Sequence, residues 1–146
     1  MNYDAVEILF AEDSIDDATL TIRALVKSGF TNKLYHVKDG AEALDFIYCR
    51  GMYASRNINE KPKLILLDLK MPKLTGMEVL EKIKSDPNFK SIPVVILTSS
   101  NEDPDVQKCY ALGANSYIVK PVDSDNFFNA IKEIGMYWVI INQPQH

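Results

Sequence analysis

The chain has 146 residues, of which 47% are hydrophobic and 25% charged, and its formal net charge is −4. This length predicts one domain with a real hydrophobic core, and the composition excludes wholesale disorder. The negative charge argues against nucleic-acid binding, and no apolar run reaches the ~20 residues that a membrane span needs. Two separated cysteines and the absence of a signal-peptide pattern favour a reduced, cytoplasmic compartment.

Apolar segments alternate along the chain with segments of helical periodicity. The expected strands are Val6–Ala11, Asn32–Val37, Leu64–Leu67, Ile92–Thr98 and Ser116–Val119. Unbroken apolar runs are typical of parallel strands covered on both faces, whereas the more polar second strand belongs at a sheet edge. The alternation predicts an α/β fold with a parallel sheet, right-handed crossovers and helices on both faces.

Capping residues mark where the helices begin. The expected starts are Ser14, Asp39, Thr75, Asp103 and a position near Asp123. Thr75 and Glu78 form a capping box, and Pro104 suits the first helical position. The first helix carries its apolar side chains at Ile15, Ala18, Ile22, Leu25 and Val26. Met52–Lys61 is polar and irregular, and it is long for a connection within a compact domain.

Polar side chains follow four of the expected strands: Glu12, Asp13, Asp68, Thr98 and Lys120. The carboxyl ends of parallel strands share one edge of the sheet, where ligands bind in open α/β folds. Clustered carboxylates favour a bound cation, and oxygen ligands suit Mg²⁺. Asp68 then suits the role of a nucleophile toward phosphorus, with Lys120 and Thr98 contacting phosphoryl oxygens. Each residue alone has an ordinary structural explanation, but their occurrence at four strand ends together favours the functional one.

The sequence resembles the receiver domain of two-component response regulators from about Val6 to Ile141. The motifs are Phe10–Asp13, Leu66–Pro72 with Thr75-Gly76 beyond it, Leu97–Ser100 and Lys120-Pro121. The resemblance implies a flavodoxin-like, CheY-like (βα)5 fold, doubly wound around a five-stranded parallel sheet of order 2-1-3-4-5. It also implies a single receiver domain spanning 1–146, with a core of about 6–141 and no DNA-binding output domain.

The same resemblance implies a metal-dependent phosphoacceptor. A histidine kinase would phosphorylate Asp68, with Mg²⁺ bound by Asp13, Asp68 and the backbone carbonyl of Lys70, and by Glu12 through a water. The protein would be a signalling protein that catalyses only its own phosphorylation and dephosphorylation, and not an enzyme in the usual sense. Lys70 also occupies a position that tunes phosphate lifetime in the family, and we hypothesise that its cation shields the acyl phosphate from water.

Tyr117 matches the switch aromatic of the family, which packs inward as Thr98 moves to the phosphate. The resemblance thus implies a switched protein-interaction surface near the fifth strand and the last two helices. It also implies a cis peptide bond between Lys120 and Pro121.

A narrower likeness concerns the small regulators that serve cyanobacterial phytochromes and related kinases. It rests on the long segment Gly51–Lys61 and on the extended, aromatic last helix. It implies a phytochrome-type kinase as partner and a homodimer surface on the fifth strand and last helix. Met136–Ile141 is apolar almost all round, which one exposed helix face does not explain. Ordinary core packing with a frayed end is the alternative.

Three other functions are compatible with parts of this pattern. A phosphatase of the haloacid dehalogenase superfamily would have a second acid two residues after the nucleophile, where Lys70 stands. A flavin-binding module would need a phosphate-cradling loop after the first strand, where Glu12 and Asp13 would repel the phosphate. A degenerate receiver would lack signature side chains, and all five are present.

Overall fold

The computed structural model describes residues 2–29 and 33–135. Its five parallel strands are β1 (Ile8–Ala11), β2 (Leu34–Val37), β3 (Leu64–Asp68), β4 (Val94–Thr98) and β5 (Ser116–Val119). They form one sheet in the order β2-β1-β3-β4-β5. The predicted fold and strand order are confirmed, and the polar second strand does lie at an edge.

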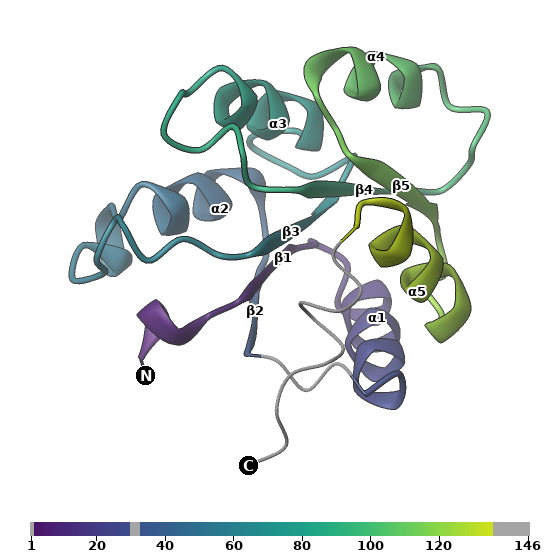
Figure 1. Ribbon diagram of the computed structural model, residues 1–146, viewed down its shortest axis with the longest axis horizontal. Helices are drawn as coiled ribbons and strands as arrows, with labels where there is room; N and C mark the ends of the chain where they lie inside the picture. Colours follow the sequence, from purple (N-terminus) through teal and green to yellow (C-terminus); the bar gives the residue numbers. More distant parts are fainter. Residues whose placement is uncertain (1, 30–32, 136–146) are drawn as a thin grey trace.

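Helices cover both faces of this sheet (Figure 1). They are α1 (Ile15–Lys27), α2 (Gly40–Ile47), α3 (Gly76–Lys84), α4 (Pro104–Leu112) and α5 (Ser124–Glu133), with short 3-10 turns η1 (Tyr3–Ala5) and η2 (Gly51–Tyr53). Alternate strand residues point to opposite faces, so the core has two parts. Leu9 and Ile65 pack with residues of α2, α3 and α4, whereas Ile8 and Leu66 pack with residues of α1 and α5. Among the described residues, no helix is long and apolar enough to cross a membrane.

The predicted helix starts are correct because each capping side chain satisfies a backbone amide that has no partner within the helix. The N-caps are Ser14, Asp39, Thr75, Asp103 and Asp123. Thr75 and Glu78 form the predicted capping box, with bonds of 3.2 Å and 3.0 Å. These caps determine where each helix begins, and so how far each begins beyond the preceding strand.

Three strands, β1, β2 and β4, begin later than predicted; β2 begins at Leu34, and its predicted start at Asn32 lies outside the described residues. The amide of Val6 donates to the carbonyl of Tyr3 and closes η1, so β1 begins at Ile8. The amide of Ile92 donates to the carbonyl of Phe89, and the next residue is a proline without an N–H group, so β4 begins only after both. Both apolar segments are buried, and local turns decide where sheet pairing starts.

The first helix departs from its predicted apolar face at both ends. Ile15 is 78% exposed and Val26 is 60% exposed, although Ala18 and Leu25 are buried against the sheet as expected. Both positions satisfy the helical spacing, but their side chains face solvent. The apolar segment Met136–Ile141 lies outside the described residues.

The segment after α2 is anchored by two buried side chains, in contrast to the predicted polar and irregular connection. Tyr53 is fully buried, and its hydroxyl donates to Glu42 Oε2 at 2.5 Å. The guanidinium of Arg56 donates to the carbonyl oxygens of Phe46 and Glu60, and it stacks over the Phe46 ring at 4.1 Å. These contacts attach the segment to α2 and to the hydrophobic core that includes Phe46 and Tyr53.

Candidate functional site

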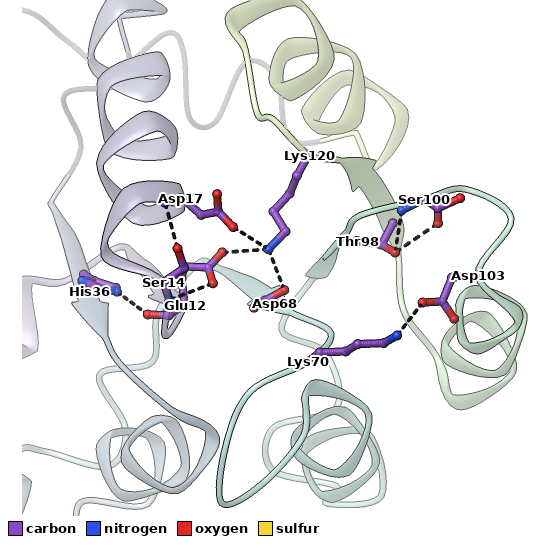
Figure 2. A network of polar contacts seen from close by, with 10 residues as sticks. All are labelled: Glu12, Ser14, Asp17, His36, Asp68, Lys70, Thr98, Ser100, Asp103 and Lys120. Atoms are coloured by element: carbon purple, nitrogen blue, oxygen red, sulfur yellow. Dashed lines mark hydrogen bonds and ion pairs between the residues drawn. The ribbon is translucent and has the colours of Figure 1, made fainter.

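Three of the predicted functional side chains, Glu12, Asp68 and Lys120, meet at the carboxyl edge of the sheet, where β1 and β3 end (Figure 2). The chain turns in opposite directions from these two strands, one toward the β2 edge and the other toward the β5 edge. This reversal leaves a crevice at the carboxyl ends, which is the usual ligand position in such sheets. Glu12 follows β1, Asp68 ends β3, Thr98 ends β4 and Lys120 follows β5.

Three carboxylates form a cluster in this crevice. Glu12, Asp13 and Asp68 each offer one oxygen atom within 4.8 Å of the others. Glu12 is fully buried, Asp68 is 4% exposed, and Asp13 faces solvent. Burial, together with the adjacent Asp68 carboxylate, raises the pKa of Glu12 to about 7, although Lys120 opposes the shift. Such a group of hard oxygen donors fits a divalent cation of the Mg²⁺ or Mn²⁺ type.

The ammonium group of Lys120 lies among the carboxylates. Its Nζ atom is 3.2 Å from Glu12 Oε1, 3.2 Å from Asp68 Oδ1 and 3.1 Å from Asp17 Oδ2. Burial disfavours the charged ammonium, but the carboxylates of Asp68, Asp17 and Glu12 outweigh burial and raise the pKa of Lys120. The lysine therefore stays cationic and offsets part of the negative charge of the cluster.

Asp17 is the site residue that the sequence did not reveal. Its position in the first turn of α1 suggests only a favourable interaction with the helix dipole. In the folded chain its carboxylate points back to Lys120, which is 103 residues away (Figure 2). One signal in the sequence could have identified Asp17 as a site residue: it is an acid one helical turn after Glu12-Asp13, and that spacing returns a helix to the side on which it began.

Thr98 lines the same cavity without contacting the carboxylates. The cavity has a volume of about 70 Å³ and is lined by Asp68, Leu69, Lys70, Thr98, Ser99, Asp103 and Lys120. The Thr98 hydroxyl donates to the carbonyl of Ser100 at 3.1 Å. The threonine therefore lies at the predicted edge with its hydroxyl bonded locally.

Lys70 spans the outer side of the cavity. Its Nζ atom lies 3.5 Å from Asp103 Oδ2, and the lysine side chain is 72% exposed. Asp103 also accepts a 2.9 Å bond from the amide of Asp105 as the N-cap of α4. The Lys70 side chain thus connects the β3–α3 loop to the start of α4.

Tyr117 lies on β5, outside the carboxylate cluster. It is half-buried, and its ring meets that of Tyr110 edge-on at 6.0 Å. It also lines a shallow cleft of about 310 Å³ between β5 and α5. The predicted cis peptide bond between Lys120 and Pro121 is present.

The backbone around Asp68 is held closely from two sides. A Cβ atom at Gly76 would lie 2.2 Å from the carbonyl oxygen of Asp68, so only glycine permits this approach of α3. The amide of Leu69 donates to the carbonyl of Leu97 at 2.9 Å. Asp68 therefore has a fixed backbone, which suits a residue that must present one oxygen atom in one direction.

Residues 8–132 match the sequence profile of the response regulator receiver domain. This chain belongs to that family. This receiver domain is 38% identical over 132 residues to the response regulator Rcp1 of Synechocystis sp.. The aligned region covers 90% of this chain and 88% of Rcp1. Rcp1 has been solved in a Mn(2+)-bound form, with a TM-score of 0.72 at 38% identity, over 90% of this chain and 92% of that one.

Solved regulators of phytochromes also resemble this receiver domain. The bacteriophytochrome response regulator RtBRR has a TM-score of 0.85 at 46% identity, over 94% of this chain and 82% of that one. The phosphorylated cyanobacterial phytochrome response regulator RcpA has a TM-score of 0.73 at 39% identity, over 92% of this chain and 95% of RcpA. The predicted family and its likeness to phytochrome-associated regulators are confirmed.

Proposed function

We propose that this receiver domain is a single-domain response regulator that accepts a phosphoryl group on Asp68 from a histidine kinase. One observation carries the proposal: the Asp68 carboxylate belongs to the cluster of three carboxylates and lies 3.2 Å from the Lys120 ammonium, at a small cavity that Thr98 also lines. This arrangement presents one nucleophilic oxygen to a phosphorus atom and surrounds it with charge of both signs. Phosphoryl transfer depends mainly on such positioning and charge neutralisation.

Asp13 and Asp68 would bind Mg²⁺ directly, together with the backbone carbonyl of Lys70, and Glu12 would act through a water. The donor set supports this assignment because it consists of carboxylate oxygens, one of them exposed and open to an incoming ion. The relative Rcp1 has a Mn(2+)-bound form, which supports a divalent cation as a ligand of this receiver domain. When bound, the ion neutralises charge on the phosphoryl group during transfer.

The reaction is a displacement at phosphorus. One Asp68 oxygen forms a bond to phosphorus while the phosphorus–nitrogen bond of a kinase phosphohistidine breaks, and the released imidazole keeps the electron pair and takes up a proton. Lys120 donates to one phosphoryl oxygen. The Thr98 hydroxyl leaves the Ser100 carbonyl and donates to another.

This movement of Thr98 leads to the output. Thr98 and Tyr117 are on neighbouring strands, and β4 and β5 pair from Val95↔Ser116 to Thr98↔Val119. When Thr98 moves toward the phosphate, the Tyr117 ring would pack inward into the space that the Thr98 side chain has left. The Tyr117 ring would then separate from the Tyr110 ring. The surface formed by α4, β5 and α5 would then change for a protein partner or for a second copy of the chain.

The partner that we propose is a sensor histidine kinase of the phytochrome type. The support is the likeness to RtBRR, a bacteriophytochrome response regulator, and to RcpA, a cyanobacterial phytochrome response regulator. A homodimer through β5 and α5 remains part of the proposal. The cleft between these two elements supports an interaction surface there.

Intact-mass spectrometry after incubation with acetyl phosphate and Mg²⁺ tests the central proposal. Wild type should gain one phosphoryl group, and Asp68→Asn or removal of Mg²⁺ should abolish the gain. Asp125→Asn, which removes an exposed carboxylate from α5, is the matched control and should behave as wild type. The proposal is overturned by a wild type that gains no phosphoryl group from acetyl phosphate or from a phosphorylated kinase, or by an adduct that persists in Asp68→Asn.

A further inference from the structure

Among residues 2–29 and 33–135, Asp17 is the one carboxylate in contact with Lys120 that belongs neither to the metal-binding cluster nor to the phosphoacceptor. Its Oδ2 atom lies 3.1 Å from Lys120 Nζ, and its side chain is 42% exposed. Asp16 in the same helical turn is exposed, and no contact with Lys120 is found for it among the described residues. The contact is therefore specific to one of two adjacent acids.

The position of Asp17 is coupled to that of Glu12 through Ser14. The amide of Ser14 donates to Glu12 Oε2 at 3.2 Å, and the Ser14 hydroxyl accepts from the amide of Asp17 at 3.2 Å. The first turn of α1 is thus held in place against the buried carboxylate of the site. Asp17 projects from this turn toward the lysine (Figure 2).

The ammonium of Lys120 has three N–H donors, and three carboxylates contact it. Lysine is a long and flexible side chain, so holding its charge at one point requires partners on more than one side. Glu12 and Asp68 are the residues whose charge balance changes when a metal or a phosphoryl group arrives. Asp17 is the partner that stays unchanged.

We propose that Asp17 is a positioning residue for phosphoryl transfer, which holds the Lys120 ammonium beside Asp68 before and after the acyl phosphate forms. This inference rests on the proposed function. Once an Asp68 oxygen carries the phosphoryl group, one lysine donor passes to a phosphoryl oxygen, while Asp17 and Glu12 retain the other two. The lysine then needs no change of rotamer during the reaction.

The test compares Asp17→Asn with Asp16→Asn in the full chain. Rates of phosphorylation by acetyl phosphate at saturating Mg²⁺ are followed by quenched-flow intact mass. Asp17→Asn should slow phosphorylation about two- to fivefold, as expected for a half-exposed ion pair. Loss of a negative charge near an anionic donor would by itself speed the reaction, and Asp16→Asn measures that effect. Asp17→Glu should recover most of the rate, because it restores a carboxylate.

A second measurement separates positioning from general damage. Mg²⁺ affinity, measured by titration calorimetry, should stay within twofold of wild type in Asp17→Asn, because Asp17 is not a metal ligand in this proposal. Equal phosphorylation rates in wild type and Asp17→Asn, equal slowing by Asp16→Asn, or a matching loss of Mg²⁺ affinity would each overturn the inference and leave the proposed function intact. A wild type that accepts no phosphoryl group overturns both.

Discussion

Lys70 is two residues beyond Asp68, and its charge reaches across the mouth of the site. Its ammonium is 3.5 Å from Asp103, in a pair whose lysine side chain is 72% exposed. Exposed ion pairs of this kind contribute only about 0–1 kcal/mol. A phosphoryl group on Asp68 would therefore compete well with Asp103 for this cation.

Lys70→Ala should lose phosphate from Asp68 faster than wild type does. The variant lacks the Lys70 ammonium that, in our hypothesis, shields the acyl phosphate from attack by water. The rate is measured as decay of the phosphorylated mass after the phosphoryl donor is removed. Lys73→Ala is the matched control, since Lys73 belongs to the same loop but pairs with Asp39. Slower loss from Lys70→Ala than from wild type would contradict the shielding hypothesis.

The segment from Tyr48 to Lys63 acts as a structural element although it contains only the short turn η2. Arg56 is the residue that anchors it, since its side chain is only 2% exposed and lies 3.9 Å from Asp4. Its guanidinium also satisfies the carbonyl oxygens of Phe46 and Glu60. Apart from the ion pair with the partly buried Asp4, these contacts satisfy backbone carbonyl groups with hydrogen bonds, so the arginine is difficult to replace.

Arg56→Met should lower the free energy of unfolding by about 3 kcal/mol, because two carbonyl oxygens lose their donors when the apolar chain replaces the guanidinium. Urea denaturation measures the change. Arg50→Met is the control, since Arg50 is exposed and its guanidinium makes only surface contacts, an ion pair with Asp45 and a position over the Tyr48 ring. Its effect should stay within about 0.5 kcal/mol. Similar effects of the two substitutions would show that the segment is not anchored by Arg56.

At the scale of the whole molecule, the buried carboxyl group of Glu12 makes the stability of the fold depend on pH. Burial, followed by the Asp68 carboxylate, raises the pKa of Glu12 from 4.5 to about 7. A raised pKa means that the folded chain binds this proton more tightly than the unfolded chain does. The stabilisation from protonated Glu12 is therefore complete below about pH 4.5 and is lost as the pH rises through about 7.

In chelator-treated protein, the stability difference between wild type and Glu12→Gln should fall as the pH rises from 4.5 to 7. The amide does not titrate, so the variant removes this one contribution and leaves the other titrating groups in place. Added Mg²⁺ should stabilise wild type more at pH 8 than at pH 5, because the ion favours ionised carboxylates. Chemical denaturation at several pH values measures both effects, and a pH-independent difference would be the contrary result.

Local patterns in the sequence determine the fold and most of the site. Apolar runs identify the strands, and the caps at Thr75 and Asp103 place helix starts that depend only on neighbouring residues. Parallel strands carry whatever follows them to one edge, so Asp68 and Lys120 meet there without any knowledge of side-chain conformation. This is why the ends of β1 and β3 sufficed to predict the carboxylate cluster.

Only the tertiary structure decided which side chains pair across that edge and beneath the loops. The contacts of Asp17 with Lys120, of Lys70 with Asp103 and the burial of Arg56 leave no periodic signal in the sequence. Their partners are determined by the reach of long side chains and by the packing of elements that are distant along the chain. All of these contacts depend on the exact backbone positions, and the two ion pairs are partly exposed and weak, so residue type and spacing do not specify them.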